Sequence, residues 1–125
     1  MVEAGHEAFD LGTRVNDMVH AYVLRRTEVR SDMKWAEYRA LSDHDPRRDA
    51  YRDARERVCT DAFLAIRSRR SRQDFVEYFT GTICSVPQYL PPGEYTGLAG
   101  ALLSPDRWEE VKALTMLALA GLARL

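Results

Sequence analysis

Hydrophobic residues recur at helical spacing along almost the whole chain, and this periodicity limits the possible folds more than any other feature. Val15, Val19 and Tyr22, for example, fall on one stripe of a helix. Strand-like alternation and hairpin dipeptides such as Asn-Gly are absent from the sequence. We therefore expect an all-α protein, a single-domain bundle of five to six helices over residues 1–125.

Proline, serine and aspartate mark the boundaries of the expected helices. In Asp45-Pro46, an acceptor side chain precedes a proline that fits the first position of a helix. Ser71 and Asp74 have the spacing of a capping box at another start. The expected helices run over about 7–30 with a stop at Ser31-Asp32, around Trp35 and Leu41, over 46–67, from Ser71 to a stop at Pro87, over 94–103, and from Ser104-Pro105 onward.

The composition is that of a folded domain. With 125 residues, 46% hydrophobic and 30% charged, the chain can bury a core without disulfides or metal. Cys59 and Cys84 are too few for a disulfide scaffold, and both lie in apolar stretches, so we expect reduced core residues. The N-terminal residues lack a signal pattern, and the longest apolar stretch, near 113–125, is too short to span a bilayer. We therefore expect a cytoplasmic protein with no membrane partner.

Catalytic and metal-binding patterns are missing from the sequence. The three histidines lie far apart and show no ligand spacing, and no nucleophile elbow or phosphate-binding glycine loop is present. We therefore expect a protein that is not an enzyme and that uses no cofactor and no metal.

A run of arginines is the strongest functional signal. Residues 65–72 contain four arginines and no acid, although the net charge of the chain is only −1. A guanidinium can donate two parallel hydrogen bonds to one phosphate, so a nucleic-acid backbone is the first partner to consider. No helix-turn-helix, zinc-finger or ribonucleoprotein motif indicates that bases are read, so we expect binding without sequence specificity.

Other arginines fall where helix phasing predicts an apolar surface. Arg48 and Arg55 lie inside the apolar arc of the helix over 46–67, and Arg26 and Arg30 continue the stripe of the first helix. Such an arginine must find an acid, project past the core or meet a phosphate. Surface ion pairs and the helix dipole are the competing explanations. The candidate nucleic-acid-binding residues are Arg25, Arg26, Arg30, Arg48, Arg52, Arg55, Arg67, Arg69, Arg70 and Arg72.

Three stretches of the chain resemble one known family. They are VCTDAFLAIRSRRSRQDFVEYFTGTICSVPQYL at 58–90 and, more loosely, AYVLRRTEVRSDMKW at 21–35 and WEEVKALTMLALA at 108–120. Together they resemble the C-terminal helical region of the large subunit of type I CRISPR Cascade complexes, in an I-B-like branch. In that family the same bundle is also made separately as the small subunit, the Cas-eleven protein, and this chain is similar to that product.

The resemblance implies a non-catalytic subunit of an antiviral surveillance complex. Such a subunit is present in several copies and helps to hold the guide RNA–target DNA heteroduplex and the displaced strand, the R-loop. The implied partners are guide RNA, target DNA, the Cascade large and backbone subunits, and further copies of the chain. Reading backbone rather than sequence suits a complex in which base pairing supplies specificity. Arginines on positions shared with the family are Arg25, Arg26, Arg30, Arg67, Arg69 and Arg70.

Two other functions remain open from the residues alone. The chain can be a protein-only assembly factor whose arginines contact acidic surfaces of partners. It can also be a separate regulator that binds a defined duplex.

Overall fold

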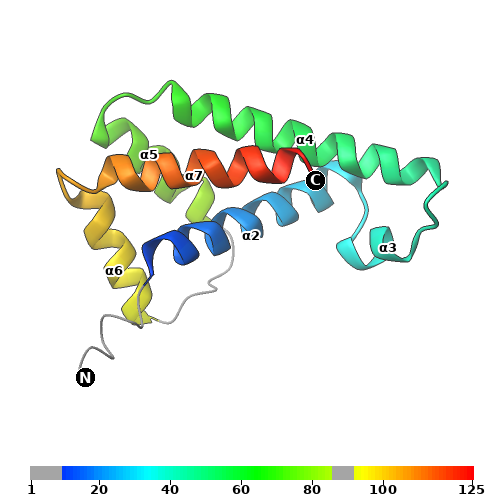
Figure 1. The fold of residues 1–125 in the computed structure, drawn as a ribbon, viewed down its shortest axis with the longest axis horizontal. Helices are drawn as coiled ribbons and strands as arrows, with labels where there is room; N and C mark the ends of the chain where they lie inside the picture. The colour runs from blue at the N-terminus through cyan, green and yellow to red at the C-terminus, as the bar shows by residue number, and fades with distance from the viewer. Residues whose placement is uncertain (1–9, 86–91) are drawn as a thin grey trace.

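The computed structural model describes residues 10–85 and 92–125, without the side chains of residues 85 and 92–95. These residues contain no strand, and they form six α-helices and one short 3-10 helix, which confirms the all-α expectation (Figure 1). The elements are α2 (Leu11–Ser31), α3 (Trp35–Ala40), α4 (Pro46–Arg67), α5 (Arg72–Gly81), η1 (Ile83–Ser85), α6 (Pro92–Leu103) and α7 (Trp108–Ala123).

Three long helices, α2, α4 and α7, pack side by side along the molecule. In Figure 1, α2 and α7 run in the same direction, and α4 runs antiparallel to both. Helices α5 and α6 lie at one end, and α3 lies at the other end beside the N-terminal half of α4. The chain therefore has a helical rod with different elements at its two ends.

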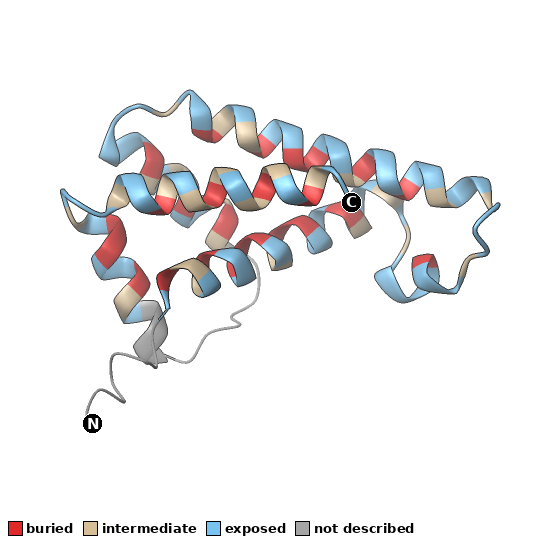
Figure 2. Cartoon of the chain, viewed as in Figure 1, coloured by how far each residue is buried: buried red, intermediate tan, exposed pale blue. Residues whose placement is uncertain are grey.

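The core is built from the apolar stripes that the periodicity predicted. Val15 of α2, Ile66 of α4 and Val111 of α7 are fully buried. Phe75 and Phe79 of α5 fill the space at one end, with ring centroids 5.5 Å apart. The buried positions, red in Figure 2, face the interior that the long helices share, while the outer faces are exposed. Burial of these stripes is the main source of stability.

Several predicted boundaries are confirmed by their capping contacts. Asp45 caps α4, since its carboxylate accepts from the main-chain nitrogen of Arg47 at 2.9 Å. Ser71 caps α5, since its hydroxyl oxygen accepts from the main-chain nitrogen of Asp74 at 3.1 Å. Asp32 ends α2 in the left-handed region, with φ of 57°. Local sequence therefore sets where these helices begin and end.

Four boundaries differ from the prediction. Helix α2 begins at Leu11, after the N-cap Asp10, and not near residue 7, and α6 begins at Pro92 and not at residue 94. Helix α5 ends at Gly81, well before Pro87, because the chain turns there and Ile83 of η1 enters the core. Pro87 itself lies outside the described residues. Helix α7 begins at Trp108 and not at Ser104-Pro105. The hydroxyl oxygen of Ser104 instead accepts from the two main-chain nitrogens of residues 106 and 107, which form a turn before the helix.

Both cysteines are free thiols, as expected. Cys59 is fully buried and Cys84 is half-buried, and burial raises the pKa of these thiols to about 11 and about 12. Their thiolate forms, which are the reactive ones, are therefore scarce near neutral pH. Among the described helices, none combines the length and the apolarity that a membrane span requires.

Candidate nucleic-acid interface

The arginine run forms the connection between α4 and α5, and we call residues 67–72 the arginine loop (Figure 1). Its main chain is anchored from α7, because the Lys112 ammonium donates to the carbonyl oxygen of Arg69 at 2.5 Å. The hydroxyl of Ser68 donates to the carbonyl of Ala65 at 2.9 Å, and Ser71 caps α5. The loop is therefore held in place although it lies on the surface.

Two of the four arginines in this loop are used to hold the bundle together. The guanidinium of Arg69 lies over the ring of Tyr78, 4.8 Å from its centroid, in a cation–π contact. Arg72 donates to the carbonyl oxygen of Leu103 at the end of α6. These contacts join the loop to α5 and to α6, so neither guanidinium is wholly available to a ligand.

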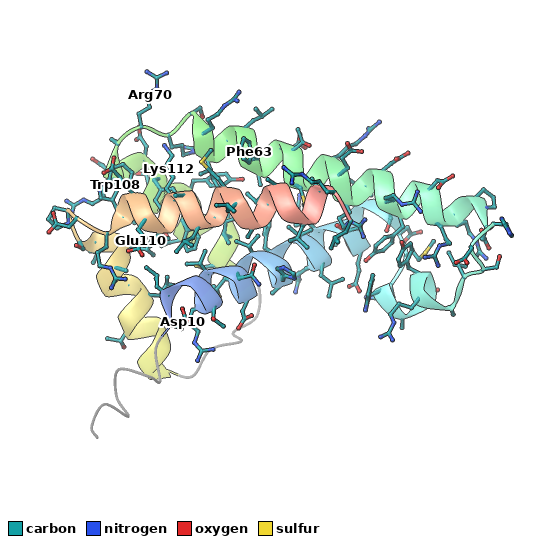
Figure 3. The ribbon with its side chains drawn as sticks, in the orientation of Figure 1. Asp10, Phe63, Arg70, Trp108, Glu110 and Lys112 are labelled. Atoms are coloured by element: carbon teal, nitrogen blue, oxygen red, sulfur yellow. The ribbon has the colours of Figure 1, made fainter. Side chains whose placement is uncertain are left out.

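The other two arginines of the loop, Arg67 and Arg70, are exposed. Neither side chain makes a hydrogen bond or an ion pair with the parts of the chain that the structure describes. Arg70 extends outward from the bundle in Figure 3. Two free guanidinium groups on an anchored main chain can each donate a pair of hydrogen bonds to a phosphate.

Arg30 lies beside α4, where it pairs with Asp61 at 3.3 Å. Both side chains of this ion pair are largely exposed, so the pair contributes little and can be exchanged for another anion. Arg30 and Arg57 line a shallow hollow of about 480 Å³ together with Asp53 and Asp61. We call it the α2–α4 hollow. Arg57 is not among the ten candidate arginines, and the structure shows that it lines the same hollow as Arg30.

Tyr78 links the α2–α4 hollow to the arginine loop. Burial raises the pKa of Tyr78 to about 12, with smaller contributions from Tyr22 and from the charge of Asp61, while Arg69 acts in the opposite direction. Tyr78 is therefore close to Asp61, the partner of Arg30, and also to Arg69. The Tyr78 hydroxyl is therefore influenced by one charge from the α2–α4 hollow and by one from the arginine loop.

The candidates nearer the start of α4 have partners in the protein. Arg48 donates to the carbonyl oxygen of Leu41 at 3.1 Å and lies 4.6 Å from the ring centroid of Tyr38. Arg52 pairs with Asp49 at 3.1 Å, one turn away on the exposed side.

Arg55 donates to the main-chain oxygen of Leu125. Helix phasing had predicted an acid, a position past the core or a phosphate for Arg48 and Arg55, and the structure shows main-chain oxygens as their partners instead.

The two remaining candidates, Arg25 and Arg26, are exposed on α2 and have no partner among the described residues. Arg25 faces a depression that also carries Glu28 and Glu37, so acids balance its charge. Arg26 lies one helical turn before Arg30, on the same side of α2.

The described residues do not bring three or more metal-ligating side chains of histidine, cysteine, aspartate or glutamate together. What the site can do chemically is bind anions through guanidinium groups. Sequence reasoning missed Lys112 and Tyr78, and only their contacts with Arg69, which is distant in sequence, reveal their part in the loop.

Comparison with known proteins identifies one family. The family model for the type I-B CRISPR Cas8b C-terminal domain matches residues 1–122. No curated protein matches the chain.

Proposed function

The chain belongs to the type I-B CRISPR Cas8b C-terminal domain family, and from that premise we propose that it binds nucleic-acid backbone without sequence specificity. Membership makes it a component of a type I-B Cascade. In this proposal it acts in the cytoplasm as a non-catalytic small subunit that stabilises the guide RNA–target DNA heteroduplex and the displaced strand. Its protein partners are the Cascade large subunit, the backbone subunits and further copies of itself.

One observation carries the proposal: Arg67 and Arg70 are exposed and unpaired, within the described residues, on a loop whose main chain is anchored. An exposed arginine that has no acidic partner, on a chain whose net charge is only −1, is available to bind an external anion. Phosphates are the anions that a planar guanidinium fits best, and the contacts they make carry no sequence information.

The proposal divides the ten candidate arginines by what they contact. Arg67 and Arg70 are the principal phosphate ligands. Arg26 and Arg30 extend the surface along α2, since the exposed Arg30–Asp61 pair can open toward a phosphate. Supporting roles go to the arginines that already hold main-chain oxygens, an aromatic ring or a neighbouring acid, or that lie among acids: Arg25, Arg48, Arg52, Arg55, Arg69 and Arg72.

The experiment compares strand binding by Cascade that contains either the normal chain or an Arg67→Gln, Arg70→Gln variant. Affinity for a labelled single strand is measured by fluorescence anisotropy from about 50 to 200 mM salt. Each phosphate contact contributes about 0.7 to a log–log salt slope for a single strand, so the variant slope should be shallower by about 1.4 for each copy of the chain that contacts the strand. Two strands of unrelated sequence should be affected alike.

A charge control is Arg39→Gln with Arg47→Gln, which removes the same charge from exposed arginines of α3 and α4 at the other end of the bundle. Because these two arginines contact Trp35 and Asp45, thermal unfolding of the control variant is measured alongside. Equal salt slopes for normal and variant complexes would refute backbone binding by Arg67 and Arg70. If the Arg67 and Arg70 substitutions instead prevent incorporation into the complex, the arginines contact acidic protein surfaces and the chain is a protein-only assembly factor.

A further inference from the structure

The outer face of α7 differs from the outer faces of the other two long helices. Residues 113–123 contain no charged side chain, so about three turns of this helix present only small and apolar groups to water. Helices α2 and α4 instead carry charges of both signs on their exposed sides. Leu117 of α7 is 71% exposed, more than any other large hydrophobic residue that the structure describes. An uncharged outer face of this kind marks a contact surface for another protein.

Gly121 lies on this outer face, one helical turn after Leu117. A glycine inside a helix costs stability relative to alanine. The bundle itself does not require this glycine, because a methyl group in its place would meet nothing within 4 Å apart from the backbone of α7. A second helix packed closely against α7 does require it, since a residue without a side chain lets another backbone approach.

The exposed residues of α7 are arranged symmetrically about Leu117. Ala113 and Gly121 lie four residues before and after it, and Glu110 and Arg124 lie seven residues before and after it. At about 100° per residue the five share one side of the helix, and all five are exposed. With a rise of about 1.5 Å per residue, the acid and the base lie at nearly equal distances from Leu117 along the axis.

The charges at the two ends of this face determine how a second copy of α7 can run. The Arg124 side chain makes no hydrogen bond or ion pair within the described residues. Glu110 pairs with Arg107 at 3.2 Å, but both side chains are about half exposed, so this pair is easily exchanged. In an antiparallel pair of α7 helices, Glu110 of each copy meets Arg124 of the other. In a parallel pair, like charges would meet.

We propose that the outer face of α7 binds a second copy of this chain, with the two α7 helices antiparallel about a two-fold axis at Leu117. The two Leu117 side chains contact each other, and Ala113 of each copy packs on Gly121 of the other. Glu110 and Arg124 form two ion pairs between the copies. The occupant is a second copy because the face is complementary to itself, and such a contact closes as a dimer.

This inference deepens the proposed function, which includes contacts between copies, by assigning the surface that makes them. It does not require that Arg67 and Arg70 bind a strand. Equal salt slopes in the strand-binding experiment would refute the phosphate contacts and leave the α7 contact standing. Loss of the α7 contact would leave the salt slopes unchanged.

The first test measures disulfide formation between copies in the reconstituted complex, in a glutathione redox buffer. Leu117→Cys should give a cross-linked dimer of the chain, and Val29→Cys, which is 67% exposed on α2, should not. The native Cys59 is fully buried and Cys84 is half-buried, and both are present in every variant. The absence of a Leu117→Cys dimer, an equal yield from Val29→Cys, or a disulfide with another subunit only overturns the proposal.

The register is tested by mixing two single variants in the same complex. Ala113→Cys chains mixed with Gly121→Cys chains should cross-link at least tenfold faster than either chain alone, because only the mixture brings the two thiols together. Equal rates in the mixture and in one chain alone overturn the antiparallel arrangement. Rapid cross-linking of Ala113→Cys chains with one another shows a parallel pair and also overturns it.

The second test exchanges the charges in the free chain that carries Leu117→Cys, at concentrations where the cross-linking rate is proportional to the dimer population. Glu110→Arg or Arg124→Glu replaces two attractive pairs with two repulsive ones, so the rate should fall about tenfold. The double variant restores opposite charges and should cross-link within about twofold of the starting rate. Glu109→Arg makes the same charge change beside the face and should also stay within about twofold.

Recovery in the double variant separates a contact between copies from an effect on folding, and thermal unfolding of each variant is measured alongside. A double variant no faster than the slower single variant overturns the proposal. A starting rate for Leu117→Cys that does not exceed the rate for Val29→Cys overturns it as well.

Discussion

Replacement of Lys112 by methionine should loosen the arginine loop without disturbing the core. Lys112 is half-buried, and methionine keeps most of its apolar stem, so the change is confined to the ammonium and its 2.5 Å hydrogen bond to the Arg69 carbonyl. Hydrogen bonds from charged groups contribute about 1.5–3 kcal/mol, and water can reach the Arg69 carbonyl afterwards, so about 1.5 kcal/mol is expected. For 125 residues, this corresponds to a fall in Tm of about 6 °C.

The same replacement should weaken strand binding, because a loop that has lost its anchor must be ordered when it binds. Ordering the backbone of one residue costs about 1–2 kcal/mol, which corresponds to a loss of affinity of about 5- to 30-fold. Thermal unfolding followed by circular dichroism measures the first effect, and anisotropy with the reconstituted complex measures the second. The matched control is Lys34→Met, which changes the only other lysine, an exposed one. A change in Tm below about 2 °C together with normal strand affinity would show that the Lys112 contact does not hold the loop.

Two further outcomes follow from contacts elsewhere in the bundle. Arg48→Met should lower the free energy of unfolding by about 1–2 kcal/mol, because Arg48 donates to the carbonyl oxygens of Tyr38 and Leu41 and lies over the Tyr38 ring. Denaturant unfolding measures this change, and an unchanged midpoint would contradict the prediction. The pKa of Tyr51 and of Tyr78 is raised from 10 to about 12, mainly by burial, so the fold favours their neutral forms. This contribution to stability is complete below pH 10 and is lost as the pH rises to 12, and ultraviolet titration should show two tyrosines that ionise late; ordinary titration of all six would contradict it.

Much of the fold could be predicted because its signals are local. The helical period, the Asp45-Pro46 start and the Ser71 cap act within one or two turns, and the structure contains all three. The errors arose where tertiary packing ended a helix and where a local turn delayed the start of one. Ile83 turns into the core after Gly81, and the turn after Ser104 precedes α7, so proline positions alone were misleading.

Only the amino-acid composition of the candidate site could be predicted. The density of arginines at 67–72 is visible in the sequence, but which of them are free is not. Arg72 meets a carbonyl 31 positions away, Lys112 reaches one 43 positions away, and Arg55 reaches one 70 positions away. Every residue type carries the same carbonyl, so no sequence pattern marks these acceptors.

The sequence by itself therefore determined a helical bundle, some of its caps, its free thiols and the presence of an arginine run. Tertiary structure decided that Arg69 and Arg72 hold the loop while Arg67 and Arg70 project from it, and that the side of α7 with Leu117 faces outward. The physical reason is the separation along the chain of the residues that interact. Helix periodicity and caps are set by neighbours along the chain, whereas the availability of a charge depends on which distant main-chain atoms the packing brings within hydrogen-bond distance.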